Sequence, residues 1–255
     1  MCIRDRPHFE ASKRLRVICK YGVGTDNIDM NAAEEYAVKV LNLPGINCAS
    51  VAEMALGLMF CAARRIAEGD RLLRKGTWKQ LLGFPLKGKT LGMIGTGAIG
   101  MTLAGMVGGL EMKILAYDII QTEELLNIGG EYVSLNDLLR KSDFITLHLP
   151  SNDKTFHLLS ENEFNLMKNQ AILINTSRGP IVDEKALYHA LKAKKIAGAG
   201  LDVFEKEPPF ESEILLLDNV VCTPHISAYT HETLRCMDAE SVKAVSRALE
   251  TQILR

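Results

Sequence analysis

Two short apolar runs near the start of the chain each end in turn residues and predict two strands. They cover 15–21 (LRVICKY) and 38–43 (VKVLNL). The glycines and the Asp/Asn cluster of YGVGTDNID predict a loop after the first strand. Between the strands, Asn31 is expected to cap a short helix that reaches Tyr36.

A long helical pattern follows Ser50, and no break is predicted in it before Gly69. Its Met-rich face is expected to lie in the core or at a subunit interface, because flexible apolar side chains fill irregular gaps. Residues 1–10, in contrast, are polar, lack a hydrophobic period and show no signal-peptide pattern, so they are expected to be a segment foreign to the protein.

From Thr90 onward, apolar runs alternate with helical patterns. This alternation predicts an α/β fold, a Rossmann-type doubly wound parallel sheet with helices on both faces. The expected strands are 90–95, 113–118, 144–150, 171–177, 198–204 and 219–226. The expected helices begin near Ala98, cover 135–140, 161–168 and 183–195, and end with an amphipathic helix from His231.

The composition is that of an ordinary globular protein, with 47% hydrophobic and 24% charged residues in 255. A formal charge of -1 gives no electrostatic footprint for nucleic acid or for an anionic membrane. The longest apolar stretch, 51–63, is far shorter than the ~20 residues that span a bilayer. Six scattered cysteines without CxxC or metal-ligand spacing favour reduced thiols in a cytoplasmic protein without a metal.

GTGAIG is a complete GxGxxG motif, placed between a predicted strand and a predicted helix. Gly95 permits the tight turn, Gly97 lets the backbone approach a pyrophosphate, and Gly100 lets helix and strand pack closely. Asp118 ends the next strand, where its carboxylate would accept from ribose hydroxyls and repel a 2′-phosphate, so NAD is favoured over NADP. The expected cofactor contacts here are Gly95, Gly97, Ala98, Ile99, Gly100 and Asp118.

Three further strand ends, NTSRG, GLDVFEKEPP and TPHI, carry residues suited to hydride transfer to a 2-oxo acid. Such a substrate needs a cation for its carboxylate, a proton donor for its carbonyl oxygen and a group that tunes the donor. Arg178, His225 and a carboxylate supply these groups, and strand ends converge in a doubly wound sheet. Glu205 and Glu207 compete as the carboxylate, because strand alternation would put both on one face.

In this order and spacing, these motifs resemble the signature of the NAD-dependent D-isomer-specific 2-hydroxyacid dehydrogenases. The resemblance runs from about Leu15 to the C-terminus, and YGVGTDNID followed by SVAE is most similar to phosphoglycerate dehydrogenase-like members. It implies that His225 is the acid/base and that Glu207, immediately before a proline, hydrogen-bonds it and raises its pKa. It further implies that Arg178 binds the substrate carboxylate and polarises the carbonyl.

The same resemblance implies weaker assignments. Asp202 would orient the nicotinamide carboxamide, Thr176 would contact the cofactor through its backbone, and Pro150 would also lie at the cofactor. An early loop would present backbone amides to the substrate carboxylate, although glycines are also normal turn residues. The expected substrate-binding residues of that loop are Gly22, Val23 and Gly24.

The family resemblance also implies a domain organisation. Residues 1–46 would form a partial flavodoxin-like substrate domain, completed by 228–255, and 47–227 would form the NAD-binding domain. Only 46 residues precede the long helix, whereas each βα unit takes ~30, so the first units are expected to be missing. Poor solubility or weak activity is expected of such a chain.

Three hypotheses for function follow. The first is hydride transfer between NAD(H) and a D-2-hydroxy acid, with 3-phosphoglycerate leading and glycerate/hydroxypyruvate, glyoxylate or lactate behind it. The second is a non-catalytic NAD-sensing protein, like the transcriptional corepressors that share this fold. The third is an inactive fragment that binds NAD at most. The family also implies a homodimer formed through the 51–63 helix.

Overall fold

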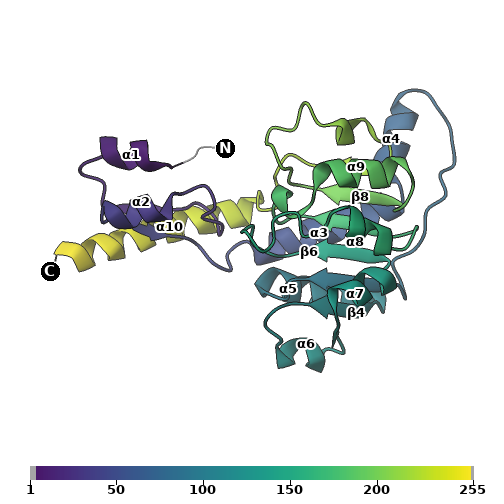
Figure 1. Ribbon diagram of the computed structural model, residues 1–255, viewed down its shortest axis with the longest axis horizontal. Helices are drawn as coiled ribbons and strands as arrows, with labels where there is room; N and C mark the ends of the chain where they lie inside the picture. The colour runs from purple at the N-terminus through teal and green to yellow at the C-terminus, as the bar shows by residue number, and fades with distance from the viewer. Residues whose placement is uncertain (1–3, 254–255) are drawn as a thin grey trace. The chain divides into compact units, whose positions relative to one another are not determined.

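The chain divides into two compact units. Unit 1 combines Met1–Ser50 with Ala228–Arg255, and unit 2 is Val51–Ser227. The computed structural model, shown in Figure 1, describes residues 4–253. The domain boundaries expected from the sequence lie within four residues of these unit boundaries. The identity of unit 1 as part of a substrate domain stays a prediction.

Unit 2 is built on one parallel seven-stranded sheet, so the predicted α/β class with a parallel sheet is confirmed. Its strands are β3 (Thr90–Ile94), β4 (Lys113–Tyr117), β5 (Glu131–Tyr132), β6 (Phe144–Leu147), β7 (Ile172–Asn175), β8 (Gly198–Leu201) and β9 (Val220–Cys222). Their spatial order is β5-β4-β3-β6-β7-β8-β9. The chain therefore crosses over between β5 and β6, and the strand order reverses between β3 and β6, where such sheets bind dinucleotides.

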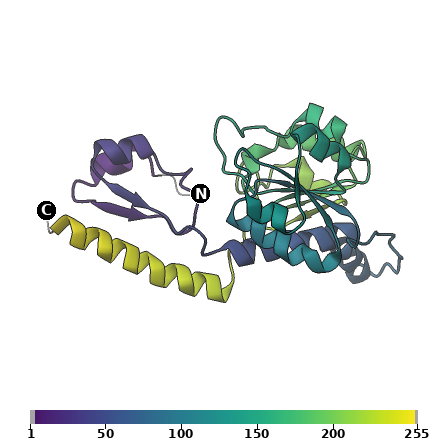
Figure 2. The ribbon, with the colours of Figure 1, turned by 90° about the horizontal axis from the view of Figure 1, so that it is seen from below.

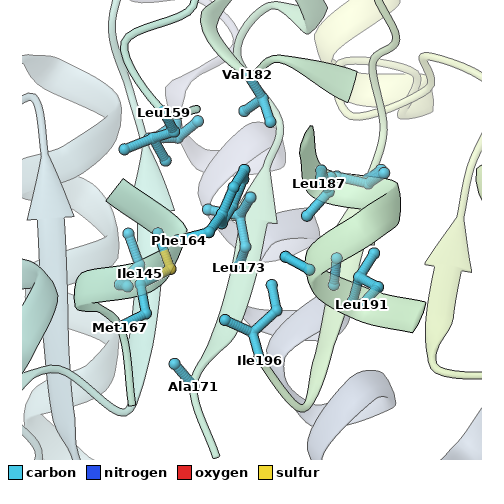
Figure 3. Close-up of a cluster of buried hydrophobic side chains, with 14 of the residues drawn as sticks. Ile145, Leu159, Phe164, Met167, Ala171, Leu173, Val182, Leu187, Leu191 and Ile196 are labelled. Atoms are coloured by element: carbon cyan, nitrogen blue, oxygen red, sulfur yellow. The ribbon is translucent and has the colours of Figure 1, made fainter. Parts of the chain in front are cut away.

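Helices cover both faces of this sheet. The helices α7 (Leu135–Lys141), α8 (Glu161–Leu166) and α9 (Glu184–Lys192) pack on one face, and α3 (Cys48–Ala63) and α5 (Ala98–Val107) on the other. Successive strand residues alternate between the two cores: Ile145 faces the first and Phe144 the second. Figure 3 shows the first core, where Phe164 of α8 lies beside Leu173 of β7.

The helix after Ser50 is interrupted, so the prediction of an unbroken helix up to Gly69 is wrong. α3 ends at Ala63, Arg65 adopts a left-handed φ of 54°, and a second helix, α4 (Ile66–Arg74), begins. The carbonyl of Ala63 accepts from the amide of Phe84 at 3.2 Å, so the returning chain takes an acceptor that a continued helix would use. Hydrophobic spacing continues across this break and does not reveal it.

Smaller elements complete unit 2. The short helix α6 (Glu123–Asn127) and the strand β5 were not predicted, because neither is long enough to show a period. Three 3₁₀ turns occur in the described residues, at Gly108–Leu110, Gly179–Ile181 and Glu213–Leu216.

Unit 1 contains two parallel strands, β1 (Val17–Cys19) and β2 (Lys39–Leu41). Figure 2 shows them between α1 (Arg6–Ala11) and α2 (Met30–Glu35) on one side and α10 (His231–Ile253) on the other. Tyr21 fixes α10 to this sheet, because its hydroxyl lies 2.9 Å from Oδ1 of Asp238. No helix within residues 4–253 combines the length and the apolar character needed to cross a membrane.

Unit 1 contains one helix that was not predicted and one cap that was predicted wrongly. Residues 6–11 form α1, where Phe9 is 2% exposed and stacks on Tyr36, so part of the polar opening segment belongs to the core. The cap of α2 is Asp29 rather than Asn31: its carboxylate accepts from the amide of Ala32 at 2.8 Å.

Candidate active site

The candidate cofactor residues of unit 2 follow the carboxyl ends of the parallel strands, which is the edge where open α/β sheets bind ligands. The glycine loop follows β3 at the point where the strand order reverses. The other candidate cofactor residues follow four further strands: Asp118 after β4, Pro150 after β6, Thr176 after β7 and Asp202 after β8.

The glycine loop has the geometry that its sequence predicts. Gly95 has φ +99°, and a Cβ added there would lie 2.6 Å from the carbonyl oxygen of His148. A Cβ on Gly100 would lie 2.5 Å from the carbonyl oxygen of Gly95, so helix α5 packs directly against the turn. A Cβ on Gly97, the N-cap of α5, would meet no described atom within 4 Å. The backbone is thus open at Gly97, where the amide end of α5 faces an approaching anion.

Asp118 is held in place by backbone donors. Its Oδ2 accepts from the amide of Thr96 at 2.7 Å, and its Oδ1 accepts from the amide of Ile120 at 3.1 Å. Burial raises the pKa of Asp118, but these hydrogen bonds outweigh burial and the pKa falls below its ordinary value. An ionised, oriented carboxylate therefore stands at the end of β4.

Two buried polar atoms near the glycine loop and β7 lack partners within residues 4–253. Oγ1 of Thr176 is one, and Nδ1 of His148 is the other. The His148 ring lies beneath the loop, and burial lowers its pKa to about 4, so the ring is neutral. Pro150 is exposed and its carbonyl accepts from Oγ1 of Thr155 at 2.7 Å. An open glycine turn, an oriented carboxylate and an unpaired hydroxyl fit a dinucleotide at this edge.

The sequence-predicted acid/base pair is in contact. Nδ1 of His225 lies 2.9 Å from Oε2 of Glu207, and the two residues come from the segments that follow β9 and β8. The hydrogen bond with Glu207 raises the pKa of His225 above 6.5, against burial, which lowers it. Burial raises the pKa of Glu207, but the hydrogen bond and the charge of His225 outweigh it, and the pKa falls. The pair therefore favours the protonated form of His225 beside an ionised carboxylate.

Arg178 lies close enough for its charge to lower the pKa values of both Glu207 and His225. Its carbonyl accepts from Nδ2 of Asn175 at 2.9 Å, which fixes the turn after β7. A Cβ on Gly179 would overlap the backbone of Phe204, so the Arg178 turn packs against the segment that leads to Glu207. The structure therefore brings the three predicted residues to one region.

Glu205 does not share the position of Glu207. Its Oε1 lies 3.1 Å from Nε2 of His157 and accepts from the amide of Glu184 at 2.7 Å, at the start of α9. β8 ends at Leu201, so the strand alternation that would place both carboxylates on one face does not reach them. Of these two carboxylates, Glu207 is the one bonded to His225.

Asp202 supports the segment that carries His225, a relationship that sequence reasoning missed. It is 0% exposed, and its carboxylate accepts from the amides of Ile226 and Ser227 and from the hydroxyl of Thr223. The hydroxyls that flank the histidine in TPHIS were the available signal, since a buried carboxylate needs such donors. The predicted contact of Asp202 with a carboxamide stays a prediction.

A second loop with glycines, residues 22–24, lies in unit 1 after β1. Gly22 has φ +126°, its carbonyl accepts from the amide of Leu43, and the carbonyl of Val23 accepts from Nδ2 of Asn42 at 2.7 Å. These bonds use carbonyl oxygens, so they do not engage the amides that were expected to bind a substrate carboxylate. The substrate-binding role of Gly22, Val23 and Gly24 stays a prediction.

A parallel sheet of this strand order, with an open glycine turn at the reversal and a histidine-carboxylate pair after neighbouring strands, is the arrangement expected of a nicotinamide-dependent dehydrogenase. Residues 56–227 match the model of the D-isomer specific 2-hydroxyacid dehydrogenase NAD binding domain, and the chain belongs to that family. The resemblance in the motifs is thereby confirmed. The chain is an NAD-dependent D-2-hydroxyacid dehydrogenase.

Curated relatives and a solved structure agree with this assignment. The chain is 45% identical over 254 residues to a glyoxylate reductase of Korarchaeum cryptofilum, covering 95% of this chain and 76% of that protein. It is 47% identical to a D-3-phosphoglycerate dehydrogenase of Archaeoglobus fulgidus, covering 89% and 44%. The D-lactate dehydrogenase of Aquifex aeolicus, crystallised with NAD and lactic acid, superimposes with a TM-score of 0.91 at 33% identity, covering 98% and 81%.

Proposed function

We propose that the chain reduces a small 2-oxo acid with NADH, and oxidises the D-2-hydroxy acid in reverse, through Arg178, Glu207 and His225. The observation that carries the proposal is the 2.9 Å hydrogen bond between His225 and Glu207 beside the charge of Arg178. NADH, when bound, supplies the hydride. The residues of this chain bind the substrate and move the proton.

The proton moves at a defined atom of His225. Nδ1 is engaged by Glu207, so Nε2 is the nitrogen that gives its proton to the carbonyl oxygen during reduction. The carboxylate of Glu207 stabilises the imidazolium before transfer and keeps Nδ1 protonated afterwards. In oxidation, the neutral ring takes the hydroxyl proton.

Arg178 has a separate role in the proposal. Its guanidinium pairs with the substrate carboxylate in the two-point manner typical of arginine, and the pairing orients the neighbouring carbonyl toward His225. The hydrogen bond from Asn175 to the Arg178 backbone limits the movement of this turn. The positive charge also favours the negative charge that develops on the substrate oxygen.

We propose glyoxylate or hydroxypyruvate as the first substrate candidates and 3-phosphohydroxypyruvate as the next. The glyoxylate reductase of Korarchaeum cryptofilum, of which this chain spans 76%, supports the first candidates. The sequence from Tyr21 to Asp29 and the SVAE segment favour the phosphorylated substrate, as does the Archaeoglobus fulgidus relative, of which the chain spans 44%.

The test is NADH oxidation, followed by absorbance, with glyoxylate, hydroxypyruvate, 3-phosphohydroxypyruvate and pyruvate offered separately. His225→Asn is expected to lower kcat by roughly 10²–10⁴-fold, the usual contribution of a general acid. His189→Asn, on the exposed surface of α9, is the matched control and is expected to keep the wild-type rate. Unchanged turnover in His225→Asn would refute the proposed role, and the substrate with the highest kcat/KM identifies the class.

A further inference from the structure

A chain of hydroxyl groups leads to Asp118 from the edge of the sheet. Tyr132 lies in the edge strand β5, and its hydroxyl is 3.0 Å from Oγ1 of Thr96. Thr96 is the residue between Gly95 and Gly97, and its Oγ1 donates to Oδ2 of Asp118 at 3.1 Å. The amide of Thr122 donates to the Tyr132 oxygen at 3.1 Å.

The direction of these hydrogen bonds follows from their last acceptor. An ionised carboxylate only accepts, so the single hydroxyl proton of Thr96 points to Asp118. The Tyr132 hydroxyl lies 3.0 Å from Oγ1 of Thr96 and 3.3 Å from Oγ1 of Thr122, and we assign its proton to the shorter contact, so Thr96 accepts it. The Tyr132 oxygen in turn accepts from the amide of Thr122. The donors therefore run in one direction, from Thr122 through Tyr132 and Thr96 to Asp118.

This arrangement treats the two carboxylate oxygens unequally. Oδ2 receives both the amide and the hydroxyl of Thr96, whereas Oδ1 receives the amide of Ile120. The amide of Ile119 adds a weaker interaction with the carboxylate. Because Oδ1 accepts one hydrogen bond within the geometric limits and Oδ2 accepts two, Oδ1 is the oxygen that keeps acceptor capacity for a further donor. Thr96 is only 5% exposed, so its hydroxyl has little access to water as an alternative partner.

We propose that Thr96 and Tyr132 are positioning residues that set the selectivity for NAD over NADP, by holding Asp118 so that Oδ1 faces the adenosine ribose. The proposal rests on the role of Asp118 at that ribose. A carboxylate that is already fixed accepts from the 2′-hydroxyl without losing side-chain entropy on binding. It also keeps a negative charge where a 2′-phosphate would lie, which disfavours NADP. Without the Thr96 hydroxyl, Oδ2 keeps only the amide of Thr96, so the carboxylate is held less firmly and both effects are weakened.

The test is calorimetric binding of ADP-ribose and of 2′-phospho-ADP-ribose, which needs no turnover. Thr96→Val removes the hydroxyl and keeps the shape, and it is expected to lower the ratio of the two affinities roughly tenfold, mainly through weaker ADP-ribose binding. Thr96→Ser restores the hydroxyl and is expected to stay within about twofold of wild type. Tyr132→Phe is expected to lower the ratio by about threefold, because the Thr96 oxygen loses its donor and its own hydrogen bond to Asp118 is weakened.

Two controls separate this proposal from its premise. Asp118→Asn removes the charge and is expected to lower the ratio most; an unchanged ratio there would overturn both the premise and the proposal. Tyr188→Phe removes a hydroxyl in α9 that accepts from Lys192 and has no bond to Thr96, Tyr132 or Asp118. It is expected to change neither affinity. If Asp118→Asn lowers the ratio but Thr96→Val and Tyr132→Phe do not, the positioning role is overturned. If Thr96→Val fails to fold by circular dichroism, Tyr132→Phe decides.

Discussion

Nε2 of His157 lies 3.1 Å from Oε1 of Glu205, and this pairing takes the carboxylate nearest in sequence to Glu207 away from the reaction. The two glutamates therefore form a natural comparison. One is bonded to His225, and the other joins the start of α9 to the segment after β8.

Glu207→Gln is expected to lower the rate of 2-oxo acid reduction by roughly tenfold or more at pH 8, because His225 loses the partner that keeps it protonated. Glu205→Gln is expected to keep the wild-type kcat, since its contacts are with His157 and Glu184. Steady-state kinetics of both variants check this. Equal losses in the two variants would contradict the assignment of Glu207.

The pH dependence of reduction has a definite sign. His225 must carry a proton, and the hydrogen bond with Glu207 raises its pKa above 6.5, so reduction is expected to persist above pH 6.5 and then fall tenfold per pH unit. Oxidation is expected to rise through the same range. In Glu207→Gln the midpoint of kcat/KM against pH is expected to move down, because burial and Arg178 both lower the pKa. A midpoint that stays in place would assign the titration to another group.

Two glycines of the same turn are expected to fail in different ways. Gly95→Ala forces a side chain into φ +99° and against the carbonyl of His148, which costs about 2 kcal/mol or more and lowers Tm by several degrees. Gly97→Ala meets open space, so Tm is expected to stay near wild type while NADH affinity falls roughly tenfold. Thermal unfolding and NADH titration distinguish the two. A large loss of Tm in Gly97→Ala would contradict the geometry.

A homodimer formed through the 51–63 helix remains a prediction, and a neighbouring segment adds apolar surface to it. Residues of α3 such as Ala55 and Met59 are 0% exposed and fill the core of unit 2, so only the opposite face of the helix is available to a second subunit. Trp78 and Leu82, after α4, are 87% and 90% exposed and offer further apolar surface. Trp78→Ser with Leu82→Ser is expected to shift sedimentation from dimer to monomer. If the wild type sediments as a monomer, the prediction of a homodimer is wrong.

The elements that could be predicted are those whose structure is set by residues close to them in the sequence. The strands of unit 2 follow from continuous apolar runs, since a parallel sheet is buried on both faces. The turn at Gly95 and the cap of α5 follow from glycine chemistry at fixed spacing. His225 and Glu207 were found through the order of motifs, and their contact agrees with the role that the resemblance gave them.

The parts that could not be predicted depend on tertiary contacts. The end of α3 depends on Phe84 reaching back to Ala63, more than one helical turn of sequence away. Asp29 and Asn31 have equal capping chemistry, and only the observed start of α2 separates them. Strand alternation alone left Glu205 and Glu207 open, and only the resemblance selected Glu207. The contact that occupies Glu205 depends on the position of His157, which no local pattern links to either glutamate.

Unit 1 is made from both ends of the described chain, whereas unit 2 is one uninterrupted stretch. During synthesis, unit 2 is therefore complete once Ser227 has left the ribosome, and it can fold as the remaining residues are added. The strands β1 and β2 are made before unit 2 but must wait for α10, which packs on them and meets Tyr21. These two strands thus reach their final partner only after unit 2 is complete.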